Sequence, residues 1–380
     1  MAGVYFHVPF CKQACHYCDF HFSTSLRQRD DMVAALCREV ALQSRYLAGE
    51  EAIIETIYFG GGTPSLLATG EINQLVSAVA SHFDIHPHAE VTIEANPDDL
   101  SNAYVHALRA TPVNRFSIGI QSFFEEDLRW MNRAHNAVEA HGAIKRVQDA
   151  GFNRITADLI YGYPLLTDAK WQSNITRLVE MGVPHISAYG MTVEPRTALA
   201  ASIRKGKQWP MDEEQAARQF GELMDALAAA GFTHYEISNF ARPGNEARHN
   251  SNYWKGVPYI GIGPSAHSFN GHSRQWNVPN NARYIKAIQA DSLPCEKEAL
   301  STADKLNEYI MTALRTIWGL DLDVVESRFG DSYRQALHIA LQRFKSSGDI
   351  ALIGAVATLT RKGKLFADHI AAELFVEEDG

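Results

Sequence analysis

The sequence predicts an α/β fold, a partial parallel (βα)6 barrel followed by a mainly helical, winged-helix-like C-terminal domain. Up to about residue 190, short β-branched or aromatic runs alternate with amphipathic helical stretches, which is typical of a parallel sheet. A complete eight-stranded barrel needs about 250 residues, so six units in about 190 residues favour a partial barrel. From Ser301 onward the order becomes helix, helix, short strand pair, helix.

The expected barrel strands are short apolar runs separated by helices. They are Val4–Val8, Thr56–Phe59, Glu90–Glu94, Arg115–Ile120, Arg154–Ile160 and His185–Tyr189. Between them, apolar residues recur at helical spacing, as at Ile72, Leu75 and Val79. Because the carboxyl ends of parallel strands meet at one rim, we expect the active site there.

The segment after the barrel is less regular. A helix is expected from Asp212 to near Gly231, then a strand-like run Tyr235–Phe240, a loop Ala241–Asn252 and a Gly/Pro-rich run 256–269. The predicted domains are a barrel, 1–190, a barrel extension, 191–294, and a C-terminal domain, 295–380.

The C-terminal domain is expected to hold two amphipathic helices, around Leu306–Ile317 and Tyr333–Phe344. A hairpin of Asp349–Leu352 and Val356–Leu359 should follow, with Gly354 at its turn. We interpret this winged-helix-like module as a lid or docking domain. DNA binding is a weak alternative, because the chain as a whole is acidic.

The composition narrows the classes of function. With 35 basic against 44 acidic residues, the formal charge is −9, which argues against a broad nucleic-acid surface. We see neither a signal peptide nor an uncharged apolar run of about 18 residues, so the expected location is the cytoplasm.

Three of the five cysteines fall within eight residues, as Cys11, Cys15 and Cys18. Thiolates at this density suit an iron–sulfur cluster or zinc. A cubane cluster held by three cysteines leaves one iron open, which is a place for chemistry. The alternatives are a disulfide, free buried thiols, or a zinc site completed by His7, His16 or His21.

Further polar and glycine residues follow the other predicted strands, so they share the rim with the cysteines. They are Gly60-Gly61-Gly62-Thr63-Pro64, Glu94-Ala95-Asn96-Pro97, Gln121 and Asp158. Each alone also fits a simple turn or a helix cap. Their shared position beside the thiols favours a functional interpretation.

The cysteine triad together with Gly-Gly-Gly-Thr-Pro resembles the radical S-adenosylmethionine (SAM) superfamily over roughly the first 190 residues. This resemblance implies a [4Fe–4S] cluster whose open iron is chelated by SAM. Nearly the whole chain resembles a narrower group, the oxygen-independent coproporphyrinogen III oxidase family. The SAM-contacting residues that this resemblance implies are Tyr5, Gly61, Gly62, Thr63, Glu94, Gln121, Arg133 and Asp158.

Two departures separate the chain from the oxidases of that family. Those enzymes carry a fourth cysteine where this chain has Phe20, and an N-terminal extension before the motif. The run His249-Asn250-Ser251-Asn252-Tyr253-Trp254 resembles the signature of the family's heme-chaperone branch. It implies His249 as an axial heme ligand. Arg248 is a weaker candidate for pairing with a heme propionate, and His267 is a weaker candidate for approaching the same pocket.

The resemblance therefore implies a heme chaperone that passes heme to an acceptor, such as a membrane respiratory protein, and takes electrons from flavodoxin or ferredoxin. Whether it cleaves SAM stays open, and coproporphyrinogen oxidase activity is not expected. One alternative is the coproporphyrinogen III oxidase, which is a radical SAM decarboxylase. The other is a zinc-stapled or winged-helix binding protein. Cys37 and Cys295 are expected to be packing residues.

Overall fold

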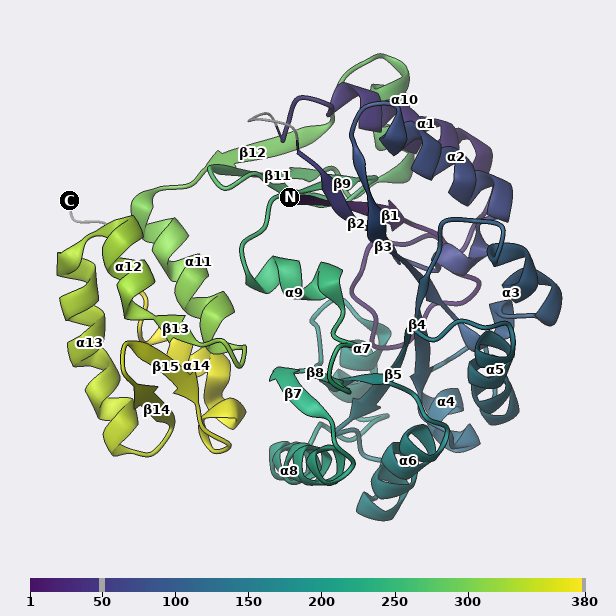
Figure 1. Cartoon of the computed structure of the whole chain (residues 1–380). Coiled ribbons are helices and arrows are strands. Elements are labelled where there is room, and N and C mark those ends of the chain that lie inside the picture. The colour runs from purple at the N-terminus through teal and green to yellow at the C-terminus, as the bar shows by residue number, and fades with distance from the viewer. Residues whose placement is uncertain (48–51, 378–380) are drawn as a thin grey trace.

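A computed structural model of the protein describes residues 1–47 and 52–377. It contains one large curled sheet with helices on its outer side, and a smaller C-terminal unit beside it (Figure 1). Each part has its own cluster of buried apolar residues.

Six parallel strands form the centre of the large sheet. They are β1 (Ala2–Val8), β2 (Ile54–Gly61), β3 (Ile85–Ala95), β4 (Arg115–Gln121), β5 (Ile155–Tyr161) and β6 (His185–Gly190). Each strand pairs with the next in chain order, always in parallel. This confirms the six predicted βα units and the partial barrel.

Helices cover the outer side of these strands (Figure 1). They are α1 (Arg29–Leu42), α2 (Thr69–Ala80), α3 (Asn102–Leu108), α4 (Glu125–Trp130), α5 (Ala137–Asp149) and α6 (Asp168–Glu180), with short 3-10 turns η1 (Pro64–Leu66) and η2 (Pro97–Asp99). The predicted apolar face of α2, with Ile72, Leu75 and Val79, is buried. Thr167 begins α6 by accepting a hydrogen bond from the Lys170 amide.

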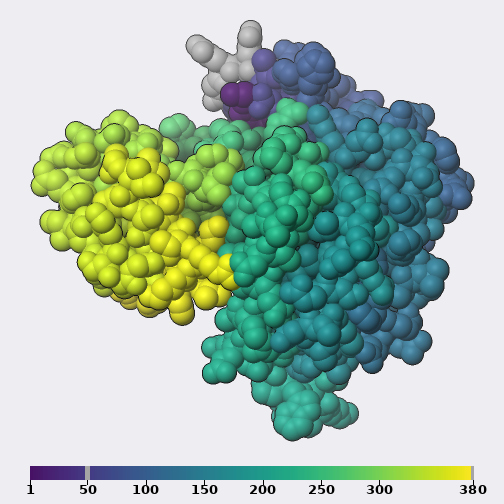
Figure 2. Space-filling view, turned by 60° about the horizontal axis from the view of Figure 1, so that its bottom comes forward, coloured from purple at the N-terminus to yellow at the C-terminus, as the bar shows by residue number. Residues whose placement is uncertain are grey.

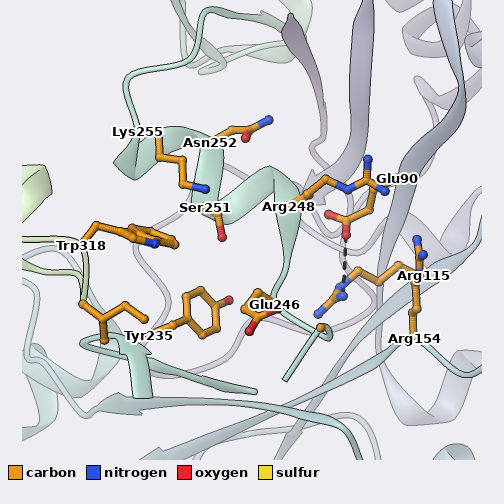
Figure 3. A pocket seen from close by; sticks show the side chains of 12 residues that line it. Glu90, Arg115, Arg154, Tyr235, Glu246, Arg248, Ser251, Asn252, Lys255 and Trp318 are labelled. Atoms are coloured by element: carbon orange, nitrogen blue, oxygen red, sulfur yellow. Dashed lines mark ion pairs between the residues drawn. The ribbon is translucent and has the colours of Figure 1, made fainter. Parts of the chain in front are cut away.

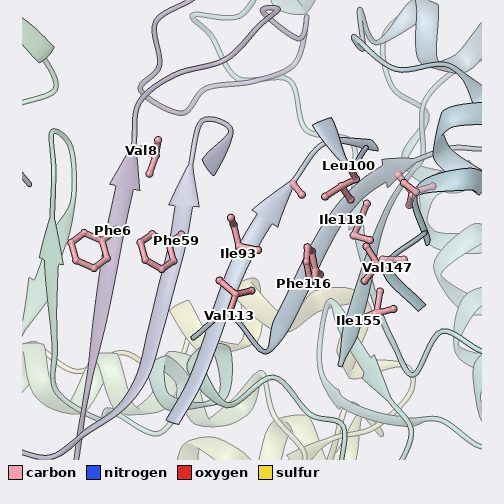
Figure 4. Packing of buried hydrophobic residues seen from close by; sticks show 14 of the residues in the cluster. Phe6, Val8, Phe59, Ile93, Leu100, Val113, Phe116, Ile118, Val147 and Ile155 are labelled. Atoms are coloured by element: carbon pink, nitrogen blue, oxygen red, sulfur yellow. The ribbon is translucent and has the colours of Figure 1, made fainter. Parts of the chain in front are cut away.

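Aromatic and branched side chains fill the space between the sheet and the outer helices. Phe6 and Phe59 come from neighbouring strands, and their rings stack 5.1 Å apart. Ile93 and Phe116 continue this layer on the next two strands (Figure 4). The period of two along each strand sends the alternate side chains to the concave side, where they are available to a site.

Further strands, most of them antiparallel to their neighbours, extend the sheet at both edges. Beyond β6 lie β8 (Asn239–Ala241) and β7 (Thr233–Glu236). Beyond β1 lie β9 (Tyr259–Ile262), β10 (His267–Phe269), β11 (Ser273–Asn277) and β12 (Cys295–Ala299). Strand β9 pairs with β1 in parallel. Tyr235–Phe240 is thus a tight hairpin and not the single strand that we predicted. The sheet also continues to Ala299, past the boundary expected at 294.

Three further helices belong to this part, α7 (Ala198–Arg204), α8 (Glu213–Ala229) and α10 (Asn281–Gln289). The predicted helix after Asp212 is confirmed as α8, whose first turn Asp212 caps. A fourth helix, α9 (Arg248–Trp254), lies where we predicted a loop. It occupies the concave side of the sheet (Figure 1).

The C-terminal unit is mainly helical, as predicted. It contains α11 (Thr302–Leu314), β13 (Leu320–Asp321), α12 (Leu322–Phe329), α13 (Asp331–Ser346), β14 (Ile350–Ile353), β15 (Val356–Leu359), η3 (Gly363–Phe366) and α14 (Ala367–Ala372). The predicted hairpin is confirmed, and Gly354 takes φ 61° at its turn. The prediction missed α12 and β13, which adds a third strand.

The C-terminal unit packs against the β7–β8 hairpin. The Ile237 amide donates to the Arg315 carbonyl at 3.0 Å, and Arg315 pairs with buried Glu236 at 3.2 Å. Figure 2 shows the yellow C-terminal unit in contact with the teal and green barrel surface. In the described residues no helix is long and apolar enough to cross a membrane.

Candidate functional site

The three clustered cysteines lie on the loop that follows β1, and all are half-buried free thiols. This loop is fastened to the chain after α4. The His16 amide donates to the Met131 carbonyl at 3.1 Å, and the Gln13 side chain donates to Asn132 Oδ1 at 2.7 Å. Tertiary contacts therefore hold the thiols at the carboxyl rim of the barrel.

The protonation chemistry of the thiols is compatible with metal binding. Burial raises the pKa of Cys11 to about 11 and also raises the pKa of Cys18. Burial therefore favours the protonated form of these two thiols, which release their protons when they bind a metal.

The zinc alternative receives no support from the geometry. His7 is hydrogen-bonded to the His21 carbonyl, His16 to the Trp130 carbonyl and His21 to Asn281. Among the described residues, no three His, Cys, Asp or Glu side chains form a group suited to one metal ion. A cubane cluster places each cysteine on a different iron, so its three sulfurs stand farther apart than the ligands of a single metal ion.

A hydrogen-bonded arc joins two of the cysteines across the strand ends. Thr63 donates to Cys11 Sγ at 3.4 Å and accepts from Asn96 Nδ2 at 3.2 Å. Asn96 Oδ1 accepts from Arg133 Nη2 at 2.6 Å, and Arg133 Nη1 donates to Cys15 Sγ at 3.3 Å. Thr63 and Arg133, both expected from the family motifs, are thus in contact with the thiols.

Two polar atoms beside this arc are buried without a partner. Within residues 1–47 and 52–377, Arg133 Nε and Gln121 Oε1 make no hydrogen bond. Gln121 also has φ 61° at the end of β4, a left-handed conformation that is uncommon for a residue other than glycine. Unpaired buried groups are costly, and strained backbone gathers at functional sites. A donor, an acceptor and an acidic neighbour are what the polar end of SAM requires.

Two carboxyl groups line the concave side next to the rim. Glu94 accepts a hydrogen bond from Tyr58 at 2.8 Å, and Asp158 accepts from Ser117 at 3.2 Å. Burial, reinforced by the charge of Asp158, raises the pKa of Glu94 to about 7. Burial raises the pKa of Asp158 to about 7 as well. Both groups can therefore change charge near neutral pH.

The glycine triplet packs closely on the cysteine loop. A Cβ on Gly62 would lie 2.6 Å from the Phe10 carbonyl oxygen, and a Cβ on Gly61 would lie 2.8 Å from the His7 ring. Gly61 also has φ 104°. We expected these glycines to admit a ligand, and the structure adds a packing reason for them.

His249 lies on α9 and is packed into the interior of the barrel. Its Nδ1 is hydrogen-bonded to Thr56 Oγ1 and its Nε2 to the Tyr253 hydroxyl, both at 2.8 Å. The ring stacks on Tyr58 at 4.9 Å and on Tyr5 at 6.5 Å. Burial lowers its pKa to about 3, so the ring is neutral. In this conformation both ring nitrogens have partners.

The other residues singled out from the sequence lie apart from this site. His267 on β10 stacks on Trp276, and among the described residues it makes no ring contact with His249. Arg248 donates to the His88 carbonyl at 3.1 Å, outside the barrel rim. Cys37 lies on α1, and Cys295 begins β12.

The sequence reasoning missed Asn96, Tyr58 and Tyr17 as members of the site. Asn96 belongs to the quoted Glu-Ala-Asn-Pro run and joins Thr63 to Arg133. Tyr17 stands between two of the cysteines and accepts from Arg133 at 3.4 Å. Position within a motif was the available signal for both, whereas Tyr58 looked like an ordinary strand residue.

Comparison with known proteins gives matches over both parts of the chain. Residues 5–193 match the radical SAM superfamily, and residues 300–366 match the HemN C-terminal domain. A protein named heme chaperone HemW from Mycobacterium tuberculosis is 36% identical over 98% of this chain and 94% of its own length. The protein of the same name from Escherichia coli K12 is 37% identical over 99% of this chain and 98% of its own length.

Among solved structures, the coproporphyrinogen III oxidase HemN from Escherichia coli superposes with a TM-score of 0.84. The match covers 99% of this chain and 90% of that one at 23% identity. This likeness supports the fold over both the barrel and the C-terminal unit.

Proposed function

The chain belongs to the HemW heme chaperone family within the radical SAM superfamily, and from this premise we propose that it carries a SAM-ligated [4Fe–4S] cluster, binds heme and transfers it to an acceptor protein. The near-full-length similarity to proteins named heme chaperones is the observation that carries the proposal. Cys11, Cys15 and Cys18 would hold the cluster, which supplies one-electron chemistry when reduced.

The rim residues have separate roles in binding SAM under this proposal. Arg133 Nε is a free donor for the carboxylate of the methionine group, and Gln121 Oε1 is a free acceptor. Glu94 accepts from the ammonium group or the ribose hydroxyls when it is ionised. The hydrogen bonds from Thr63 and Arg133 to the cysteines would fix the position of the thiolates relative to the bound SAM.

The second candidate, a coproporphyrinogen III oxidase, is favoured by the fold alone. Phe20 stands at the position of the family's fourth cysteine, and the residue is 71% exposed. Its ring cannot ligate iron, so the feature that extends the oxidase motif is missing. The heme chaperone is therefore the better supported of the two candidate functions.

Heme ligation by His249 stays a prediction, and the structure defines what it would require. The hydrogen bond between Tyr253 and Nε2, or that between Thr56 and Nδ1, must open before the ring can bind iron. If His249 is the ligand, His249→Ala will shift the Soret band of the heme complex. The exposed His141 on α5 gives a matched control as His141→Ala. An unchanged spectrum would remove His249 as the ligand.

An acidic electron donor such as flavodoxin or ferredoxin would suit the surface beside the cluster loop. The Leu199 amide at the start of α7 donates to the His16 carbonyl at 2.8 Å. The exposed cations Arg204, Lys205 and Lys207 follow on the same segment. They form a local basic surface on a chain of formal charge −9. The heme acceptor, including any membrane respiratory protein, is a proposal from family membership.

One anaerobic experiment tests the proposed function. The protein is reconstituted with iron and sulfide, and heme titration, SAM cleavage and coproporphyrinogen turnover are measured on one sample. We expect saturable heme binding without decarboxylation. Decarboxylation would move the assignment to the oxidase, and absence of heme binding would end the chaperone proposal.

A further inference from the structure

A cavity lies at the amino-terminal ends of the barrel strands, at the other end of the strands from the cysteine rim. It measures about 430 Å³, within the size range of small-molecule sites. Glu90 and Arg115 come from β3 and β4, and Ser251 comes from α9 (Figure 3). Trp318 of the C-terminal unit closes one side, so both parts of the chain build the cavity.

The charged floor of the cavity is internally balanced. Arg115 and Glu90 are each 2% exposed and pair at 3.7 Å. Arg115 also donates to Thr156 and to the Asn245 carbonyl, while Glu90 accepts from the His249 amide at 2.9 Å. These two groups therefore need no ligand, and they give the site a rigid base.

The walls carry an excess of positive charge. Arg154, Arg248 and Lys255 line the cavity, and Glu246 is the acidic residue opposite them. Arg154 and Lys255 are exposed, so their charged ends can reach a ligand. In a chain of formal charge −9, three cations against one acid form a local site for anions.

Ser251 gives an independent sign of a missing partner. The residue is 4% exposed, and within the described part of the chain its hydroxyl has no hydrogen-bond partner. Figure 3 shows this hydroxyl pointing from α9 into the cavity, towards Tyr235 and Glu246. A buried hydroxyl without a partner is costly, and a carboxylate in the cavity would accept its hydrogen bond.

One edge of the cavity is apolar and partly open. Trp318 is 40% exposed and Ile317 is 46% exposed, and Lys255 Nζ lies 4.3 Å from the centre of a Trp318 ring. A flat apolar body could lie along this edge while its charged groups face the cations. Small inorganic anions would leave the apolar edge unused.

We propose that this cavity binds the carboxylate end of a flat, apolar carboxylic acid, and specifically the propionate groups of heme. The inference rests on the proposed function, which supplies the porphyrin. Arg248, Ser251 and Lys255 lie on one face of α9, whereas His249 and Tyr253 lie on the other face, towards the barrel. The residues proposed to bind the propionates are therefore distinct from the proposed iron ligand.

The test compares ligands that differ in one chemical group. Binding is measured with heme, with iron-free protoporphyrin IX and with the dimethyl esters of both. The acids should bind wild type at least about tenfold more tightly than their esters, whether or not iron is present. The double variant Arg154→Gln/Lys255→Gln changes two exposed cations, so it should fold and lose most of this preference. Arg283→Gln, an exposed cation on α10, is the matched control.

The outcomes separate this inference from the function on which it rests. If heme binds but esters bind as tightly as acids, or if the double variant keeps the preference, the propionate site is overturned and the chaperone proposal stands. If wild type binds none of the four ligands, both fall. A preference that is lost in the double variant and kept in the control supports the site.

Discussion

The two ends of the parallel strands carry opposite chemistry. At the carboxyl ends lie three thiols and the half-buried carboxyl groups of Glu94 and Asp158, whose pKa values lie near 7. At the amino ends lies a cavity rich in arginine and lysine. A cationic cofactor suits the first end and an anionic ligand suits the second. One sheet can therefore hold two ligands of unlike charge without mixing their sites.

Helix α9 connects these two ends. His249 stacks on Tyr58, which donates to Glu94 near the rim. The His249 amide donates to Glu90 at the cavity floor. Removing groups at one end while measuring ligands at both ends will define how separate the sites are.

The largest effect is expected from the cysteines. The variant Cys11→Ala/Cys15→Ala/Cys18→Ala should lose all iron–sulfur absorbance after anaerobic reconstitution, and SAM binding with it, because no ligand set remains. Free porphyrin acids should still bind at the other end. The control variant Cys37→Ala/Cys295→Ala alters the two cysteines outside the motif. Cluster absorbance that survives the triple change would contradict the assignment.

A smaller loss is expected from Arg133→Gln. This change removes donors to Cys15, Tyr17 and Asn96 together with the unpaired Nε. Charge-assisted hydrogen bonds contribute about 1.5–3 kcal/mol each, so SAM affinity measured by calorimetry should fall by about tenfold to a hundredfold. Arg129→Gln on nearby α4 alters an arginine that is 77% exposed and should leave affinity unchanged.

Gly62→Ala tests the packing between the glycine turn and the cysteine loop. The added Cβ would meet the Phe10 backbone at 2.6 Å, and overpacking of this kind costs about 1–3 kcal/mol. Chemical denaturation should therefore show a lower free energy of unfolding. Gly70→Ala has open space around the added Cβ and is the matched control. Equal stability of the two variants would show that the turn can move away.

The smallest effect is a pH dependence of SAM binding. Burial raises the pKa of Glu94 and of Asp158 to about 7. The ligand-free fold therefore binds these protons more tightly than the unfolded chain does. Proton binding adds to the free energy of unfolding at low pH, and this contribution is lost as pH rises from about 4 to 7. The ionised forms attract cationic SAM, so affinity should increase several-fold between about pH 6 and pH 8. Glu94→Gln should flatten that profile, and a profile unchanged by it would exclude Glu94 as the source.

The regular part of the fold could be predicted because each strand is a compact apolar run. Phe6, Phe59 and Phe116 lie in such runs and are all buried. Helix α9 could not be predicted in this way, because its seven residues lack an apolar stripe. It forms through tertiary contacts, with Glu90 accepting from its first turn and Tyr58 stacking on His249. Charged β12 was missed for a similar reason, since edge strands tolerate such residues.

Motif spacing located the rim of the site better than its internal connections. The cysteines, Thr63 and Arg133 come together as the motifs suggest. The unpaired atoms of Gln121 and Arg133 appear only when burial is known. The amino-end cavity could be predicted only in part, because Arg248 and Ser251 belong to or adjoin a quoted motif, whereas Arg115 and Trp318 come from distant segments of the chain.

The position of β1 has a consequence for the order of folding. This first strand lies inside the sheet, between β2 and β9, with Phe6 opposite Ile262 on the β9 side. During synthesis one edge of β1 stays unpaired until residue 262 has emerged, and unpaired edges invite wrong association. The cysteine loop that follows β1 is also made before the segments that hold it, which include Met131 and Leu199. This delay sets a window in which a newly made chain is exposed to metals and oxidants.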